Sequence, residues 1–262
     1  MRVTLPVRNA ALYVCLCAAV ALNVRAQATS PPTLEQILMR MQAAEGAERD
    51  RPGYSVLREY QLSGTDASAP TSQVLAEVEY FPPSSKQFAI RKTEGSDRGE
   101  KIVRRVLEHE VRMTKDSGES AVIQSNYNFA LLGQENLGGR RCYLLGLNPR
   151  RDTPELLKGH AWVDADSFLI LRLEGEPAKS PSWWIKDLRV AIDYGRADGI
   201  WLPVTTHATA DLRLLGTQVL TSRDVKVQAS PENARLRQPA AEAPARKRPR
   251  NATVDAGVSM WR

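Results

Sequence analysis

Two runs of apolar–polar alternation constrain the fold of this chain most strongly. Apolar side chains alternate with polar or small ones from Leu188 to Tyr194, and again from Leu202 to Leu214. The loop 195–199, with a glycine at each end, separates the two runs. Period-two alternation places successive side chains on opposite faces of a strand. The sequence therefore predicts a long β-hairpin in an antiparallel sheet that has one apolar face.

Most of the remaining chain also reads as strands. Alternation recurs in Tyr54–Leu62, Val74–Phe81 and Lys86–Thr93, and a last strand is expected at Thr217–Val227. In the first of these segments Leu57 and Arg58 break the pattern. The chain is thus expected to be mainly β with a few helices.

The stretch Gly133–Gly175 adds four short strands joined by turns. Gly138-Gly139 supplies the positive φ angles that a tight hairpin needs. In Asp164–Ser167, polar side chains can hydrogen-bond to nearby backbone amides and so favour a turn. The stretch holds no catalytic constellation, so it argues for architecture alone.

Two helices are expected beside the sheet. In Thr33–Ala47, Thr33 and Gln36 have the spacing of a capping box, and apolar residues recur at helical intervals. In Lys101–Leu107 the apolar residues also share one face. The polar segment 108–120 allows no assignment.

Both ends of the chain differ from its middle. Residues 1–28 read as a signal peptide: a basic start, an apolar run over Ala10–Leu22 that is too short to span a bilayer, and small residues for cleavage after Ala26 or Ala28. Residues 229–262 form a basic tail rich in proline and alanine, expected to be disordered. We therefore expect an exported protein with one domain over residues 29–228.

The net charge of +6 comes from these two ends. Residues 1–26 carry +3 and residues 229–262 carry +4, which leaves −1 for residues 27–228. A nearly neutral domain lacks the basic field that attracts phosphates, so no nucleic-acid partner is expected. The tail has two interpretations, a solubilising end or a contact with an anionic envelope surface or a membrane protein.

No motif for catalysis, metal or cofactor binding is present. The three histidines, His109, His160 and His207, lack the mutual spacing of a metal site. No nucleophile elbow and no glycine-rich phosphate loop occurs. After export Cys142 is the one remaining cysteine, and its place in a strand predicts a buried thiol. We expect a non-enzymatic protein without a cofactor.

The apolar face of the predicted hairpin is the remaining candidate site. Two interpretations stay open: an ordinary core covered by the helices, or a cavity for acyl chains. If it is a cavity, seven residues form its wall: Trp184, Leu188, Val190, Ile192, Leu202, Val204 and Leu212.

A family resemblance bears on this choice. The residues that carry it are Gly133-x-Glu135, Gly138-Gly139-Arg140-Arg141-Cys142-Tyr143-x-Leu145, Leu147-x-Pro149, Ala161-Trp162-Val163-Asp164, Leu171-x-Leu173-Glu174 and Tyr194-Gly195-(x)3-Gly199-x-Trp201-Leu202-Pro203. In these segments, over roughly 33–227, the chain resembles the LolA-like outer-membrane lipoprotein-sorting proteins.

The resemblance implies a curved, incomplete antiparallel β-barrel lidded by short helices, in the bacterial periplasm. It also implies two functions. One is a non-enzymatic carrier of a lipid or a lipoprotein acyl chain, with lipoprotein sorting as one such role. The other is an envelope sensor or scaffold of the RseB type that binds a protein partner.

Overall fold

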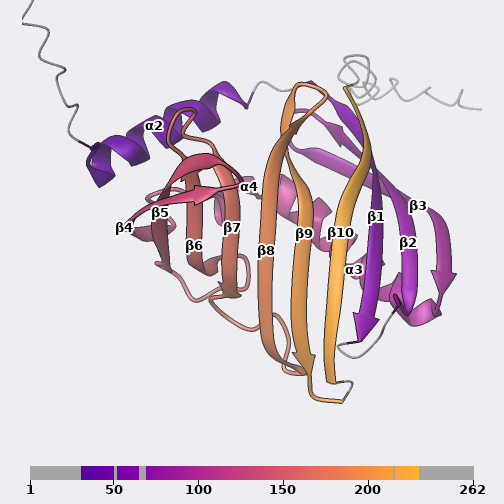
Figure 1. The fold of residues 1–262 in the computed structure, drawn as a ribbon. Coiled ribbons are helices and arrows are strands. Elements are labelled where there is room, and N and C mark those ends of the chain that lie inside the picture. The colour runs from indigo at the N-terminus through magenta and orange to yellow at the C-terminus, as the bar shows by residue number, and fades with distance from the viewer. Residues whose placement is uncertain (1–30, 50–51, 65–68, 215, 230–262) are drawn as a thin grey trace, which may run out of the picture.

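Ten strands form one antiparallel sheet in a computed structural model that describes residues 31–49, 52–64, 69–214 and 216–229 (Figure 1). The strands lie in the order β3-β2-β1-β10-β9-β8-β7-β6-β5-β4. Their bounds are β1 Tyr54–Gly64, β2 Ser72–Phe81, β3 Ser85–Gly95, β4 Tyr127–Leu137, β5 Arg140–Pro149, β6 Leu157–Asp164, β7 Ile170–Pro177, β8 Ile185–Ala197, β9 Ile200–Leu212 and β10 Gly216–Ala229. The predicted signal peptide, and all of the predicted tail except Ala229, lie outside the described residues.

The sheet is open, as expected. Its two outer strands, β3 and β4, are the ends of the strand order and do not pair with each other. β1 and β10, the third and fourth strands in this order, pair from Tyr54↔Ala229 to Gly64↔Gln218. The predicted hairpin is β8–β9. Its turn consists of Asp198 and Gly199 and is therefore tighter than the expected five-residue loop. The two residues make this turn with positive φ angles of 47° and 78°. The mainly β prediction is confirmed.

In the described part of the chain three helices accompany the sheet: α2 Leu34–Ala47, α3 Asp97–Lys115 and α4 Ser117–Ser120. The capping box predicted for α2 is present, with Thr33 Oγ1 accepting from Gln36 N at 3.3 Å and Gln36 Oε1 accepting from Thr33 N at 3.0 Å. α3 is much longer than the seven residues predicted for it. Ser96 caps its first turn, and the polar segment that allowed no assignment continues the helix through Lys115.

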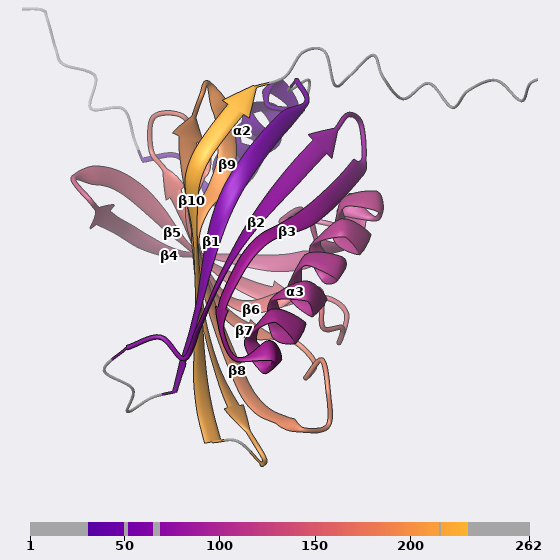
Figure 2. The same cartoon turned by 90° about the vertical axis from the view of Figure 1, so that its right-hand side faces the viewer.

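We call the sheet face toward α2 and α3 the inner face. Figure 2 shows α3 running alongside β2 and β3 on this side. Val103 and Leu107 of α3 pack on the inner-face residues Tyr60, Val74, Ala76 and Val78. Ile37 and Met41 of α2 pack on β5, β6 and β7, in a cluster that includes Leu145, Ala161, Val163 and Leu173. A third cluster joins Tyr54, Val56, Tyr80, Ile200 and Leu202.

Opposed glycines bring β6 and β7 unusually close. Gly159 pairs with Gly175, and a Cβ added at Gly159 would lie 2.1 Å from the Glu174 carbonyl oxygen. A Cβ at Gly175 would lie 2.4 Å from the carbonyl oxygen of Lys158. Gly175 also pairs with Val190 of β8, so this close approach fixes the backbone beside the predicted hairpin.

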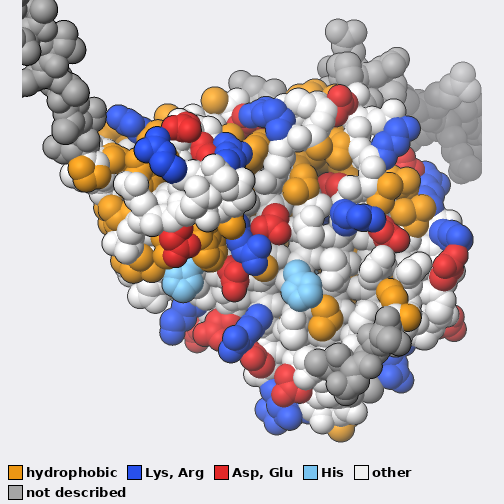
Figure 3. Space-filling model, in the orientation of Figure 1, with side chains coloured by type: hydrophobic (Ala, Val, Ile, Leu, Met, Phe, Trp, Pro, Cys, Tyr) orange, Lys and Arg blue, Asp and Glu red, His pale blue; other side chains and the backbone are white. Residues whose placement is uncertain are grey.

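The outer face of the β8–β10 region is polar. Basic and acidic side chains are interspersed over it (Figure 3). His207 is exposed on this face, as the alternation predicts, and Cys142 is fully buried and free. Among the described residues no helix combines the length and apolar character needed to cross a bilayer.

Candidate functional site: the inner face of β8 and β9

A partly exposed apolar strip lies on the inner face between the two helix-covered parts. It consists of Leu188 and Val190 of β8, paired with Ala210 and Ala208 of β9. All four side chains are partly exposed. In the described part of the chain, none of them belongs to the three packed clusters. We call these four residues the apolar strip.

The seven residues of the predicted wall divide into three groups. Leu188 and Val190 lie in the apolar strip, and Ile192 continues from it onto the α2 cluster. Leu202 is 2 % exposed and belongs to the third packed cluster. Val204 is partly exposed on the stretch of β9 between Leu202 and the strip.

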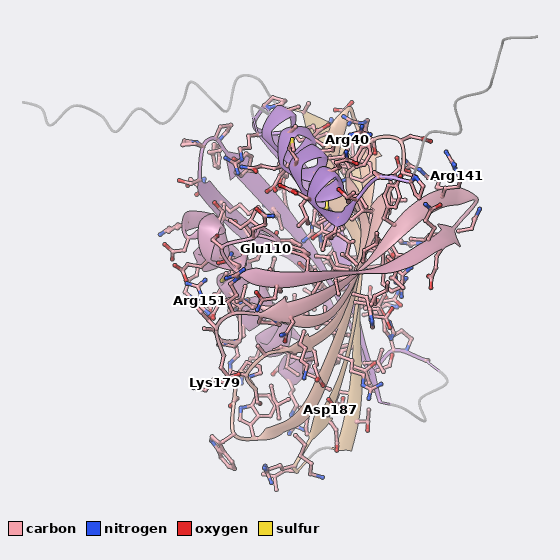
Figure 4. All side chains as sticks on the ribbon, turned by 90° about the vertical axis from the view of Figure 1, so that its left-hand side faces the viewer. Arg40, Glu110, Arg141, Arg151, Lys179 and Asp187 are labelled. Atoms are coloured by element: carbon pink, nitrogen blue, oxygen red, sulfur yellow. The ribbon has the colours of Figure 1, made fainter. Side chains whose placement is uncertain are left out.

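The last two, Trp184 and Leu212, lie at the opposite end of the strip from Leu202. They line an apolar hollow of about 370 Å³ together with Arg98, Trp183 and Leu214. Trp183 and Leu214 are 78 % and 86 % exposed, so the hollow opens to solvent. This end of the β8–β9 pair is the lower end of the molecule in Figure 4, where Asp187 of β8 is labelled.

A part-buried cluster of ionised side chains lies at the α3 side of the strip. Arg58 of β1 donates through Nε to Asp224 Oδ1 of β10 at 2.5 Å and through Nη1 to Glu110 Oε2 of α3 at 3.0 Å. Lys86 of β3 donates to Glu110 Oε1 at 2.7 Å. Figure 4 labels Glu110, which holds α3 to two strands in this way. We call Arg58, Lys86, Glu110 and Asp224 the Arg58 cluster.

The two carboxylates of the Arg58 cluster have different surroundings. Burial alone would raise the pKa of Glu110, but Lys86 and Arg58 outweigh it and lower that pKa. Burial raises the pKa of Asp224 in spite of Arg58. Both Glu110 oxygens accept a hydrogen bond, whereas Asp224 Oδ2 is buried and has no partner among the described residues. Asp224 is therefore the less completely solvated of the two.

A small pocket of about 80 Å³ opens beside this cluster. Its lining residues come from four elements: Arg58, Tyr60, Val106, Glu110, Thr206, Leu220 and Ser222. Tyr60 is 2 % exposed, and its hydroxyl has no hydrogen-bond partner in the described parts of the chain. Burial raises the pKa of Tyr60 to about 12, so the hydroxyl keeps its proton and can donate it.

The pocket and the strip are neighbours on the sheet. Leu220 of the pocket pairs with Ala208 of the strip, and Thr206 lies two residues before Ala208 on the same face of β9. From Thr206 to Leu212 the strand spans about 20 Å. The inner face thus offers a polar pocket at one end, an apolar strip, and an apolar hollow at the other end.

Reasoning from the sequence missed this polar end. One available indication was Arg58, a charged residue at an inner-face position of a strand whose neighbours Val56 and Tyr60 are buried. Asp224 offers a similar indication in the last strand. Within the ranges that the structure describes, no group of three or more metal-ligating side chains occurs.

Comparisons with known proteins find matches among solved structures alone. No family model and no curated protein matches the chain. Solved structures do match. A domain described as an outer membrane lipoprotein-sorting protein domain from Vibrio parahaemolyticus is 10 % identical, with 73 % of this chain and 91 % of that chain covered and a TM-score of 0.42. A LolA superfamily protein from Nitrosomonas europaea is 13 % identical, with 76 % and 94 % covered and a TM-score of 0.39.

A DUF1329 family protein from Desulfovibrio piger is 12 % identical, with 74 % and 90 % covered and a TM-score of 0.37. Each of them is a protein to which this chain is similar in fold. The low identities give no site residue a counterpart, so the chemistry of the site is argued from its own geometry.

Proposed function

We propose that this protein is a non-enzymatic carrier, acting in the bacterial cell envelope, that binds the acyl chain of a lipid or lipoprotein along the apolar strip. The observation that supports this most directly is the strip itself. Leu188, Val190, Ala208 and Ala210 face the helix-covered side of the sheet but are left partly exposed. An ordinary core would be covered at these positions, as it is at Ala76 and Ala161.

Size and chemistry fit an acyl chain. The strip and its two ends extend over about 20 Å, and two of its four residues are alanines, which leave room above the sheet. Each methylene moved from water onto such a surface contributes about 0.8 kcal/mol. A long chain therefore binds without any catalytic or charged contact.

Native mass spectrometry with lipid extraction tests this proposal first. The protein is exported and purified without detergent, and a co-purifying lipid or lipopeptide near one equivalent is the expected result. A protein that is empty, and stays empty after incubation with phospholipids and a lipopeptide, contradicts the proposal.

A pair of aspartate substitutions locates the bound chain. Val190→Asp puts a charge in the strip and should abolish binding while the fold persists. Thr209→Asp puts the same charge on the outer face, opposite Arg189, and should bind as the wild type does. Unfolding of Val190→Asp alone would instead identify the strip as a packed core.

A second function is favoured by one edge of the sheet. The edge strand β3 carries Arg91, Lys92 and Glu94, which discourage pairing with another chain. The other edge strand, β4, has Leu131 and Leu132 exposed at 40 % and 53 %, and Glu135 is its one charged residue. Such an edge can accept an added strand from a protein partner, as in the sensor or scaffold hypothesis.

A pull-down that compares Leu132→Lys with the wild type tests this second function. The substitution puts a charge on the β4 edge and should reduce capture of a protein partner.

A further inference from the structure

The polar pocket at the α3 end of the strip determines what kind of lipid fits. Tyr60 is part of its lining, and Asp224 lies behind the lining residue Arg58, to which it is bonded. Each carries an unsatisfied polar atom, the Tyr60 hydroxyl and Asp224 Oδ2, and the side chains of both are at least nine-tenths buried. Leaving a buried polar group unpaired costs about 1–3 kcal/mol, and more for a charged one. One such group in the lining and a second one next to the lining indicate that the pocket receives a polar molecule.

The Tyr60 hydroxyl and Asp224 Oδ2 need complementary hydrogen-bond partners. A carboxylate oxygen only accepts, so Asp224 Oδ2 requires a donor. The neutral Tyr60 hydroxyl has a proton to give, so it requires an acceptor. A hydroxyl group or a carboxamide provides both functions on adjacent atoms.

The charge of the Arg58 cluster argues against an ionised head group. Two cations, Arg58 and Lys86, balance two carboxylates, Glu110 and Asp224, and both Glu110 oxygens are already bonded. A phosphate or carboxylate would be repelled by Asp224 Oδ2, and an ammonium would add an unbalanced buried charge.

We propose that the pocket binds the uncharged polar head group of an acylated ligand, a hydroxyl or carboxamide that donates to Asp224 Oδ2 and accepts from Tyr60 Oη. This assignment rests on the proposed function, because the ligand's acyl chain would occupy the apolar strip. It places the head group beside Val106 and Glu110 of α3 and the end of the chain near the hollow of Trp184 and Leu212.

Calorimetric titration with four probes of one chain length tests the assignment. The probes are monopalmitoylglycerol, palmitamide, palmitate and palmitoyl-lysophosphatidylglycerol, each below its aggregation threshold. We expect the two uncharged probes to bind about tenfold more tightly than the two anionic ones. The uncharged head groups can donate a hydrogen bond to the charged Asp224 carboxylate, whereas the anionic ones are repelled by it. The separate hydroxyl and amide probes then show which donor is preferred.

Two substitutions connect that preference to the pocket. Asp224→Asn replaces the free acceptor by an amide, and Tyr60→Phe removes the donor. Each should weaken the uncharged probes about tenfold and leave palmitate unchanged. Glu77→Gln is the matched control, because Glu77 bonds Ser55 and Arg91 on the outer face. Tyr60→Phe keeps the test decisive if Asp224→Asn does not fold.

The outcomes separate the two proposals. If all four probes bind equally and binding depends on Val190, the carrier function stands and the head-group assignment is overturned. The head-group assignment is also overturned if Tyr60→Phe and Asp224→Asn both bind every probe as the wild type does, which would mean that the pocket holds water only. If no probe binds the wild type, both proposals fail.

Discussion

Arg58 and Asp224 are 166 residues apart in the chain, yet Arg58 Nε lies 2.5 Å from Asp224 Oδ1 on the inner face of the sheet. The two residues are directly opposite each other in the β1–β10 pairing. Their ion pair joins the first strand to the last one. Through Glu110 it also fastens α3 over the sheet, beside the polar pocket.

Filling the apolar strip should block ligand binding without harming the fold. Ala208→Phe adds an apolar side chain where the strip is partly exposed, so we expect an unchanged melting temperature and a loss of lipid binding. Ala76→Phe is the matched control. Ala76 is fully buried in the α3 cluster, and overpacking there should cost about 1–3 kcal/mol of unfolding free energy. Equal destabilisation by both changes would contradict an open strip.

Glu110→Gln should destabilise the protein in a pH-dependent way. The pKa of Glu110 is lowered in the folded state, so its ionisation stabilises the fold above its ordinary pKa of 4.5, and this contribution is lost as pH falls through the folded pKa. We expect the variant to lose about 3 kcal/mol near pH 7 and to converge on the wild type in acid. Urea unfolding from pH 2.5 to 7 measures this. A gap that does not change with pH would contradict it.

Gly159→Ala should destabilise the fold by about 2 kcal/mol. The new Cβ would lie 2.1 Å from the Glu174 carbonyl oxygen, so the backbones of β6 and β7 would have to separate. Gly46→Ala is the control: nothing lies within 4 Å of its added Cβ, and alanine favours the exposed helix by up to about 1 kcal/mol. Thermal unfolding of both variants should show opposite shifts.

Removing residues 230–262 separates the carrier function from a scaffold that binds its partner through the basic tail. The cut preserves Ala229, whose backbone N–H donates to Asp198 Oδ2 at 2.6 Å and which pairs with Tyr54. A carrier that uses the strip should retain its co-purifying lipid at the wild-type amount. A scaffold that works through its tail should keep its melting temperature but lose its partner in a pull-down.

The sequence was most informative where one face of a strand is apolar and the other is polar. The alternation around Val190 and Ala208 predicts β8 and β9, because a half-buried sheet enforces that period. The positive φ angles of Gly138 and Gly139, 57° and 84°, confirm the predicted turn. These are local properties, visible in a few consecutive residues.

What the sequence could not reveal depends on residues far apart in the chain. α3 extends beyond its predicted end because Glu110 faces inward to meet Arg58 and Lys86 instead of apolar residues. Seen alone, Glu110 is an ordinary polar residue of a charged segment. Likewise Asp224 reads as a surface acid until the β1–β10 register places Arg58 opposite it.

The pairing of β1 with β10 also determines the order in which parts of the sheet can assemble during folding. β1, β2 and β3 follow one another in the sheet, as do β4 to β9, so each group can assemble from neighbours in sequence. Within the described sheet, only β10 pairs with both groups. Until residues 216–229 are available to the folding chain, β1 and β9 each present an unpaired edge. A chain truncated before Gly216 should therefore aggregate rather than form a smaller sheet.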